Sequence, residues 1–159
     1  MAGDQTPPAP YAVRSSEGEQ IPMRGNTVTL KATAAQTGGV LTFTEVEATP
    51  GGGPPLHVHA NADEWFYVLE GDFDIVLGDE VVRAGPGDFA FVPRGTHHRF
   101  ANAGQGSARI LAALTPGGLE DFFRAAGGHH RSETVFEEAG SEHGISVVDW
   151  TGAGEPAAD

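Results

Sequence analysis

Two short stretches decide the fold: GGGPPLHVHANADEWFYVLEG at residues 51–71 and GDFAFVPRGTHHRFAN at residues 87–102. Each stretch combines glycine or proline turn signals with strand-forming residues and with side chains that can bind a metal ion. The first stretch carries His57, His59 and Glu64, and the second carries His98. We therefore expect these four side chains to share one site.

The spacing of the four residues supports a single site. His57 and His59 are two positions apart on a predicted strand, so both rings point to the same face, with Cα atoms about 7 Å apart. Glu64 begins the next apolar run across a tight loop. His98 begins a further strand, and His97 is expected to point to the outward face of that strand. The sequence thus predicts a metal site made of His57, His59, Glu64 and His98.

The donor set restricts the metal. The chain has no cysteine, so thiolate ligands and disulfides are excluded. Three imidazoles and one carboxylate suit one divalent transition metal, namely Fe, Ni, Mn, Co, Cu or Zn, and do not suit the all-oxygen sites of Mg or Ca. Such a set leaves positions open on a six-coordinate ion, which is typical of catalytic or ligand-binding sites. The residues do not choose among these metals.

The hydrophobic pattern between residues 21 and 150 predicts one all-β domain. Short apolar runs separated by Gly and Pro recur about every ten residues, as in sandwiches and barrels. The expected strands are 26–34, 39–48, 55–60, 64–70, 72–77, 80–84, 88–92, 97–102 and 107–115, with a last edge strand at 144–150. The turns at 70–72, 77–80 and 84–88 are expected to join neighbouring antiparallel strands. Short helices are expected at 119–126 and 133–142.

The ends of the chain and its charge set further limits. Residues 1–20 are predicted to be a flexible N-terminal segment and residues 151–159 a flexible tail. The chain of 159 residues has a formal net charge of −13 and no Lys/Arg cluster, so nucleic acid and anionic membranes are not expected as partners. It has no secretory signal and no apolar run near the ~18 residues that span a bilayer. We expect a cytoplasmic protein.

The two stretches resemble the two motifs of the cupin family, and the resemblance extends over about residues 38–116. It implies a small antiparallel β-barrel of the jelly-roll type, with a metal bound inside by the matching His57, His59, Glu64 and His98. Residues 63–71, 92–100 and 115–123 also resemble the quercetin 2,3-dioxygenase-like branch of single-domain cupins.

Strand alternation predicts an apolar, largely aromatic substrate pocket around the metal. The expected lining residues are Phe66, Val68, Phe73, Ile75, Leu77 and Phe100, with some of Phe89, Phe91, Ile110 and Leu114. The predicted helix that carries Phe122 and Phe123 is expected to cap the mouth. Such a pocket suits a small aromatic or enolic substrate whose oxygen binds the metal, with Glu64 as the catalytic base.

Three functions remain open. The resemblance implies a dioxygenase that uses O2 on such a substrate. The alternatives are a non-oxidative isomerase, cyclase or lyase, and a ligand-binding protein without turnover. Some lyase-type cupins place a tyrosine near the metal. The second stretch has no tyrosine, so the resemblance weakens the lyase alternative slightly. Trp65, Tyr67 and Leu69 fall on the face opposite Glu64 and are predicted to serve packing or the interface of a homodimer.

Overall fold

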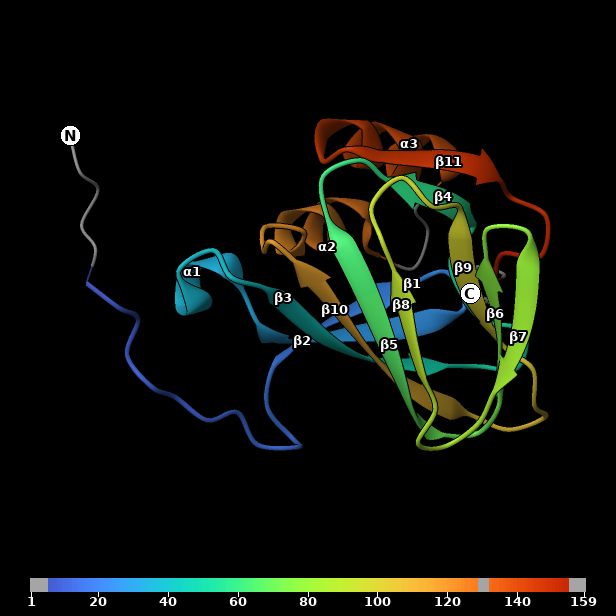
Figure 1. Ribbon diagram of the computed structural model, residues 1–159, viewed down its shortest axis with the longest axis horizontal. Coiled ribbons are helices and arrows are strands. Elements are labelled where there is room, and N and C mark those ends of the chain that lie inside the picture. Colours follow the sequence, from blue (N-terminus) through green and yellow to red (C-terminus); the bar gives the residue numbers. More distant parts are fainter. Residues whose placement is uncertain (1–5, 129–131, 155–159) are drawn as a thin grey trace.

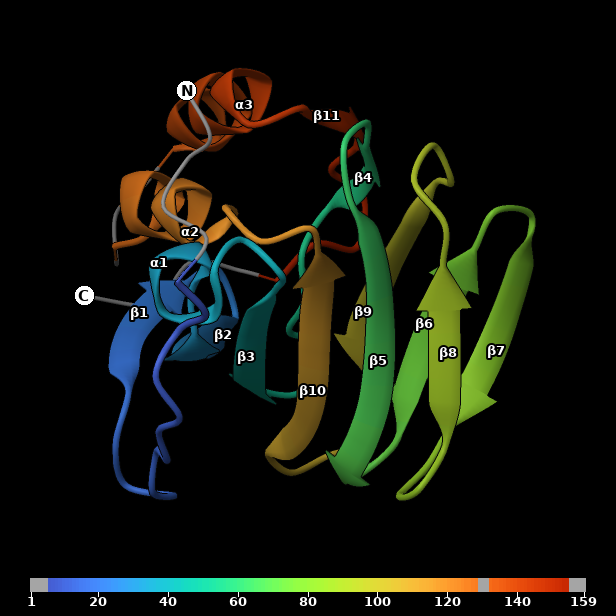
Figure 2. The same cartoon turned by 60° about the vertical axis from the view of Figure 1, so that its left-hand side comes forward.

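Two antiparallel β-sheets face each other in the computed structural model, which describes residues 6–128 and 132–154 (Figures 1 and 2). The first sheet has the order β1 (Glu19–Met23), β2 (Asn26–Ala32), β3 (Thr42–Ala48), β10 (Ala108–Thr115), β5 (Asp63–Glu70) and β8 (Phe89–Val92). The second has the order β11 (Ile145–Asp149), β4 (Leu56–His59), β9 (His98–Asn102), β6 (Phe73–Leu77) and β7 (Glu80–Ala84). The predicted all-β jelly roll is confirmed, as two facing sheets with free edges.

The N-terminal strand is a departure from the expected elements. β1 pairs with β2 through residues 19–23, so it begins inside the segment predicted to be flexible. Only Ile21 is fully buried in β1, which is too little apolar periodicity to reveal a strand in the sequence. β2 ends at Ala32 because Thr33 caps the short helix α1 (Ala34–Thr37), with the Thr33 hydroxyl accepting from the Gln36 amide.

Two of the three predicted turns connect the sheets, and for these two the prediction that they join neighbouring strands was wrong. The turn at residues 77–80 does join the paired antiparallel strands β6 and β7, as predicted. β5 pairs with β10 and β8, whereas β6, which follows it after Gly71, pairs with β9 and β7. The turn at residues 84–88 likewise leads from β7 in one sheet to β8 in the other. A local turn signal shows that the chain reverses, but it does not show which sheet receives the next strand.

The barrel interior is filled at one end and covered at the other. The inward side chains of the central strands form the main core, including the fully buried Phe66, Val68, Phe73, Ile75 and Ile110. At the other end α2 (Glu120–Ala126) and α3 (Glu133–Glu142) pack with β11 into a second apolar cluster, and Figure 2 shows both helices at that end. The two predicted helices and the final edge strand are confirmed.

The chain after β11 is fastened to this cover. The Gly154 amide donates to the Gly53 carbonyl (2.9 Å), and the Gly154 carbonyl accepts from Arg24 Nε (3.2 Å). Of the tail predicted to be flexible, residues 151–154 are therefore held in place, and residues 155–159, like residues 1–5, lie outside the described residues. Within the described ranges, no helix is long and apolar enough to cross a bilayer.

Glu120 joins the cover to the first sheet. Its buried carboxylate accepts hydrogen bonds from the Thr42 hydroxyl (2.6 Å), the Ala34 amide (2.9 Å) and the Gly118 amide (3.2 Å). Burial alone raises the pKa of Glu120, but these hydrogen bonds outweigh it, so the pKa lies below its usual value. One charged group thus fixes α1, β3 and the start of α2 relative to one another.

We expect Glu120→Ala to lower the free energy of unfolding by about 3 kcal/mol, because the half-buried Ala34 amide and the buried Thr42 hydroxyl lose their acceptor and the Gly118 amide keeps only Thr42 Oγ1. Because the native pKa is lowered, this contribution is present above the unfolded-state pKa and is lost as the pH falls through the native pKa. Urea unfolding at several pH values measures the difference. The exposed Glu138 provides the control, since Glu138→Ala should change stability by less than about 0.5 kcal/mol. Equal effects of the two substitutions would contradict the anchoring role.

Candidate metal centre

The four predicted ligands converge from both sheets. β4 supplies His57 and His59, β9 supplies His98, and the start of β5 supplies Glu64. His57 and His98 are directly opposite each other in the antiparallel pair β4–β9. One ligand atom from each of the four residues lies within 4.8 Å of all the others, and all four residues are buried, with 1–7% of their surface exposed.

Hydrogen bonds among the four groups bring the Nε2 atoms to one point. Glu64 Oε2 lies 2.7 Å from His98 Nε2 and 3.1 Å from His59 Nε2. The Nε2 atoms of His57 and His59 are 3.1 Å apart. At these short distances, the three imidazole nitrogens and the carboxylate oxygen can all face one common point, as the ligands of a single ion must.

The opposite ring nitrogens explain why these Nε2 atoms point inward. His57 Nδ1 donates to the Pro55 carbonyl (2.7 Å), and His98 Nδ1 donates to the Thr96 carbonyl (2.8 Å). Each carbonyl fixes the tautomer and ring orientation that a metal ligand needs. His59 differs, because its Nδ1 is buried and has no hydrogen-bond partner within the described residues.

Burial and hydrogen bonds shift the pKa values of Glu64, His57 and His98 in different directions. Burial raises the pKa of Glu64, but hydrogen bonds from His59 and His98 outweigh it and hold the pKa far below its usual range. Burial, followed by repulsion from His98 and His59, lowers the pKa of His57 to about 3. Burial also opposes the charged form of His98, but its hydrogen bond to Glu64 prevails and raises the pKa. At neutral pH the site therefore offers a carboxylate and a neutral His57 ring.

This donor set fits a divalent transition metal. An anionic oxygen stands beside imidazole nitrogens, two of them oriented by backbone carbonyls, and the group is shielded from water. The charge of a bound cation would also offset the free-energy cost of burying the Glu64 carboxylate. Without a cation, hydrogen bonds from His59 and His98 offset that cost. The residues do not determine which metal binds.

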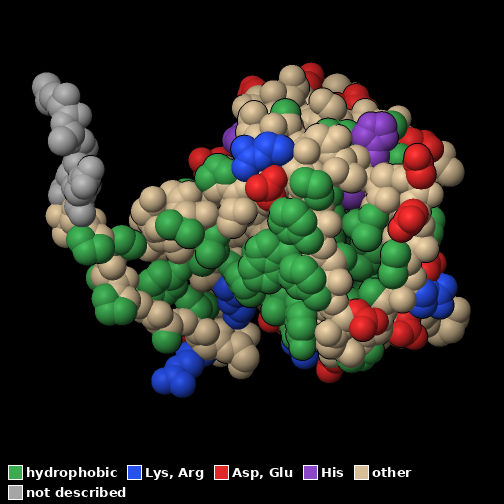
Figure 3. All heavy atoms as spheres, in the orientation of Figure 1, with side chains coloured by type: hydrophobic (Ala, Val, Ile, Leu, Met, Phe, Trp, Pro, Cys, Tyr) green, Lys and Arg blue, Asp and Glu red, His purple; other side chains and the backbone are tan. Residues whose placement is uncertain are grey.

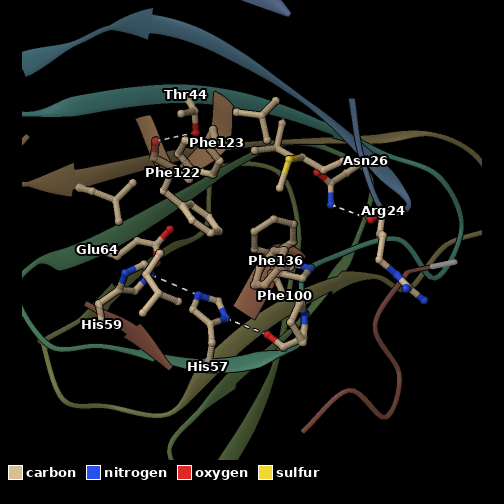
Figure 4. A pocket seen from close by; sticks show the side chains of 18 of the residues that line it. Arg24, Asn26, Thr44, His57, His59, Glu64, Phe100, Phe122, Phe123 and Phe136 are labelled. Carbon is tan, nitrogen blue, oxygen red and sulfur yellow. Dashed lines mark hydrogen bonds and ion pairs between the residues drawn. The ribbon is translucent and has the colours of Figure 1, made fainter. Parts of the chain in front are cut away.

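The metal cluster lies in the wall of a cavity of about 60 Å³ (Figure 4). His57, His59 and Glu64 line it. The apolar lining residues are mostly rings and branched side chains, drawn from the barrel and from its cover: Met23, Val28, Val46, Pro54, Pro55, Phe66, Phe100, Ala112, Leu114, Phe122, Phe123, Phe136, Ile145 and Trp150. Phe66, Phe100, Leu114, Phe122 and Phe123 are thus where the sequence predicted.

Several other predicted lining residues lie elsewhere. Val68, Phe73, Ile75 and Ile110 are in the filled core, and Leu77 packs against that core, so none of these five lines the cavity. Strand alternation showed correctly that these side chains point inward, but it carries no information about depth along the barrel. The void lies at the covered end, beside the metal ligands.

Phe89 and Phe91 point away from the cavity. They are 63% and 54% exposed, because the inward positions of β8 belong to Ala90 and Val92. On the outer face of the first sheet Phe89 lies near Trp65, with ring centroids 6.3 Å apart, and Tyr67 is 40% exposed. Hydrophobic side chains gather on this face of the molecule in Figure 3.

Sequence reasoning missed four important lining residues. Asn26 and Thr44 are polar residues at inward positions of β2 and β3, and only the strand pattern hinted at their direction. Phe136 and Trp150 belong to the cover, where their rings meet edge to face at 5.3 Å. Their place over the cavity depends on how the C-terminal segment folds back, for which the sequence contains no short-range signal.

Comparison with known proteins finds a match to the central part of the chain. Residues 44–114, a little under half of the chain, match the family model described as Cupin domain. The match contains all four metal-ligand candidates, and it ends at Leu114, before the helices that cover the cavity.

Similarity to individual known proteins is moderate. Quercetin 2,3-dioxygenase of Bacillus subtilis (strain 168) is 33% identical over 91 residues, which are 57% of this chain but only 27% of that protein. Tetracenomycin polyketide synthase protein TcmJ of Streptomyces glaucescens is 28% identical over 72% of this chain and 77% of its own length. The solved structure of the polyketide cyclase RemF from Streptomyces resistomycificus superposes with a TM-score of 0.58 at 26% identity, covering 67% of this chain and 80% of RemF.

The metal assignment predicts a sharp contrast between two adjacent histidines. His98→Ala should weaken metal binding by at least about 100-fold, because it removes a ligand whose ring is already oriented for the ion. His97→Ala is the matched control and should retain the metal, since His97 is exposed. Metal content after purification and calorimetric titration with Zn²⁺ measure both variants. Full metal retention by His98→Ala would exclude the assigned site.

Proposed function

We propose that this protein is a metal-dependent enzyme that binds a small aromatic or enolic substrate through an oxygen atom, and that it acts as a dioxygenase. The observation that carries the proposal is the position of the His57, His59, Glu64 and His98 cluster in the wall of a covered, aromatic-lined cavity. A hydrophobic cavity with one strongly polar wall favours an apolar molecule with a single reactive polar end.

In this proposal the four residues would hold the ion, whose Lewis acidity would lower the pKa of the substrate hydroxyl. Glu64 is the only carboxylate among the described residues that line the cavity, so transfer of the hydroxyl proton falls to it. With an ion in the site, the Nε2 atoms of His59 and His98 would face the metal instead of donating to Glu64, and Glu64 would have to loosen from the ion to accept a proton. Burial raises the pKa of a carboxylate freed in this way, which makes it a stronger base.

The aromatic walls would orient the substrate and exclude water. Phe66 and Phe100 meet edge to face, with centroids 5.5 Å apart, and form the floor beside the ligands. Phe122 meets Phe136 edge to face at 5.1 Å and belongs to the cover. The rings offer flat apolar surface to an aromatic substrate while leaving its oxygen to the polar wall.

The helix α2 is proposed to act as a lid. A volume of about 60 Å³ is well below the roughly 300–1,000 Å³ of common ligand pockets, so a substrate of several rings needs the cover to move. We expect the double variant Phe122→Ala, Phe123→Ala to lower turnover about tenfold, because water reaches the site and the substrate loses its orientation. Steady-state kinetics and thermal melting measure this together. Unchanged turnover in a folded double variant would contradict the lid.

Two reactions could follow deprotonation of the substrate. In dioxygenation both atoms of O2 enter the product and a carbon–carbon bond is cleaved, and similarity to quercetin 2,3-dioxygenase supports this reaction. The second candidate is a non-oxidative cyclisation. It is supported by the similarity to TcmJ along most of both chains and by the structural likeness to RemF.

An oxygen-electrode assay of Fe- and Ni-loaded protein with flavonols and catechols separates the two reactions. We expect O2 consumption that depends on both metal and substrate and that falls at least about 100-fold in Glu64→Gln, which cannot accept the proton. His97→Ala should keep full activity. Turnover of the same substrates under argon, without O2 uptake in air, would favour the cyclase and exclude the dioxygenase.

Several finer expectations stay predictions: iron or nickel as the metal, the cytoplasmic location and the homodimer. For the homodimer, the outer face with Trp65, Tyr67, Phe89 and Phe91 is a candidate interface. Charges near this face are paired, since Arg109 binds Glu45 and Glu70 while Arg94 binds Asp63, so two copies need not bring unpaired negative charges together. Sedimentation velocity of the wild type and of Phe89→Ser, Phe91→Ser tests this interface.

A further inference from the structure

Asn26 lines the cavity away from the metal cluster and keeps unused hydrogen-bonding capacity of both kinds, donor and acceptor. The Thr44 hydroxyl donates to the Ala112 carbonyl (2.9 Å). The Trp150 indole donates to Glu137 (2.7 Å). Within the described residues, the Asn26 side chain makes one hydrogen bond, from Nδ2 to the Arg24 carbonyl (3.2 Å), which leaves Oδ1 and one N–H for a ligand.

The remaining polar group, Arg24, is turned toward the cover. Its Nε donates to the Gly154 carbonyl (3.2 Å), an Nη atom lies 3.7 Å from Glu133 Oε1, and the guanidinium lies 5.3 Å from the centre of the Trp150 ring. These contacts direct the guanidinium toward the cover. Arg24 supports the cover and can only donate, whereas the Asn26 amide can both donate to and accept from a ligand on this side.

The position of Asn26 is opposite the metal cluster. Asn26 shares the inward face of β2 with Val28, and both line the cavity. In Figure 4 Asn26 lies across the cavity from His59 and Glu64, and the rings of Phe100 and Phe136 are drawn between these two sides. The cavity thus has two polar ends joined by an apolar, aromatic middle.

We infer that Asn26 is a specificity-determining residue and that the substrate is an aromatic molecule with oxygen at both ends, one for the metal and a second for the Asn26 amide. This inference rests on the proposed function, because it takes the metal end as the reactive one. The Oδ1 atom accepts from a remote hydroxyl, and the free N–H donates to a remote carbonyl. A ligand lacking the remote oxygen leaves the amide without a partner in a partly dry site, which reduces its affinity.

A competing role for Asn26 is purely local. It follows the tight turn between β1 and β2, where Gly25 has a φ of 68°, and its Nδ2 contact to the Arg24 carbonyl stabilises that turn. A turn role alone would affect every ligand equally. The two roles are therefore separated by a ratio of affinities rather than by a single affinity.

The test uses two probes that differ only in the remote hydroxyl, 2-naphthol and 2,6-dihydroxynaphthalene, titrated by calorimetry into the Zn²⁺-loaded full chain. We expect the wild type to prefer the dihydroxy compound by about fivefold, the usual effect of one hydrogen bond. Asn26→Leu should reduce this ratio to about one, with 2-naphthol affinity within about twofold. Thr44→Val, the control in the same cavity, should keep the ratio because its hydroxyl is already engaged.

Asn26→Asp separates the turn from the ligand. Aspartate cannot donate to the Arg24 carbonyl but keeps an acceptor for the remote hydroxyl, so the preference should persist while thermal stability falls. An aspartate variant that behaves like Asn26→Leu would overturn the inference. The same holds for a wild-type ratio near one, for an unchanged ratio in Asn26→Leu, and for failure of the wild type to bind either probe.

Failure of the proposed function has a different signature. If Zn²⁺ does not tighten binding of either probe, or if no turnover is found with any metal, the reactive metal end is wrong. The preference for the second hydroxyl, and its loss in Asn26→Leu, can still be read from the same titrations.

Discussion

The structure depends on one electrostatic constraint: a carboxylate, Glu64, is buried beside three histidines and is charged in the protein as it stands. Glu64 enters from the first sheet and the histidines from the second, so the contacts of 2.7 and 3.1 Å to His98 and His59 hold the two sheets in register at the covered end. A buried charge without partners would cost several kcal/mol, and here its partners are also the groups that a cation needs. Stability of this end and metal binding are therefore linked through the same atoms.

The barrel interior is packed differently on the two sides of this cluster. Below it the inward side chains of both sheets interdigitate and leave no room for a ligand. Above it the helices and the chain after β11 close the barrel without filling it, because Phe122, Phe136 and Trp150 pack against one another edge to face. Glu120 and Arg24 fasten the cover through hydrogen bonds to backbone atoms. The result is a cavity whose floor belongs to the packed core and whose roof is held by a few polar contacts.

The family match and the residues proposed to select the substrate lie in different parts of the chain. The match to the family model covers residues 44–114 and contains the ligand candidates, but it stops before α2, α3 and β11. The residues proposed to select the substrate come largely from outside it, with Asn26 on β2 and the aromatic cover in the C-terminal part. Because one fold supports many reactions, the choice of substrate is to be sought at the end of the cavity away from the metal cluster.

The sequence by itself determined the parts that depend on local geometry. The two-residue spacing of His57 and His59, the glycine and proline turns, and the inward alternation on β4, β5 and β9 are properties of a few consecutive residues, and they were sufficient to name all four ligand candidates. The helices at 119–126 and 133–142 were likewise readable from caps and composition. Tertiary structure alone decided three further matters. It assigned β5 and β6 to different sheets, it placed Ile75 in the filled core and Leu114 at the cavity, and it brought Asn26 and Trp150 to the same void. A period of two residues tells which face a side chain occupies, but depth along a barrel and contacts between distant segments arise only when the whole chain is packed.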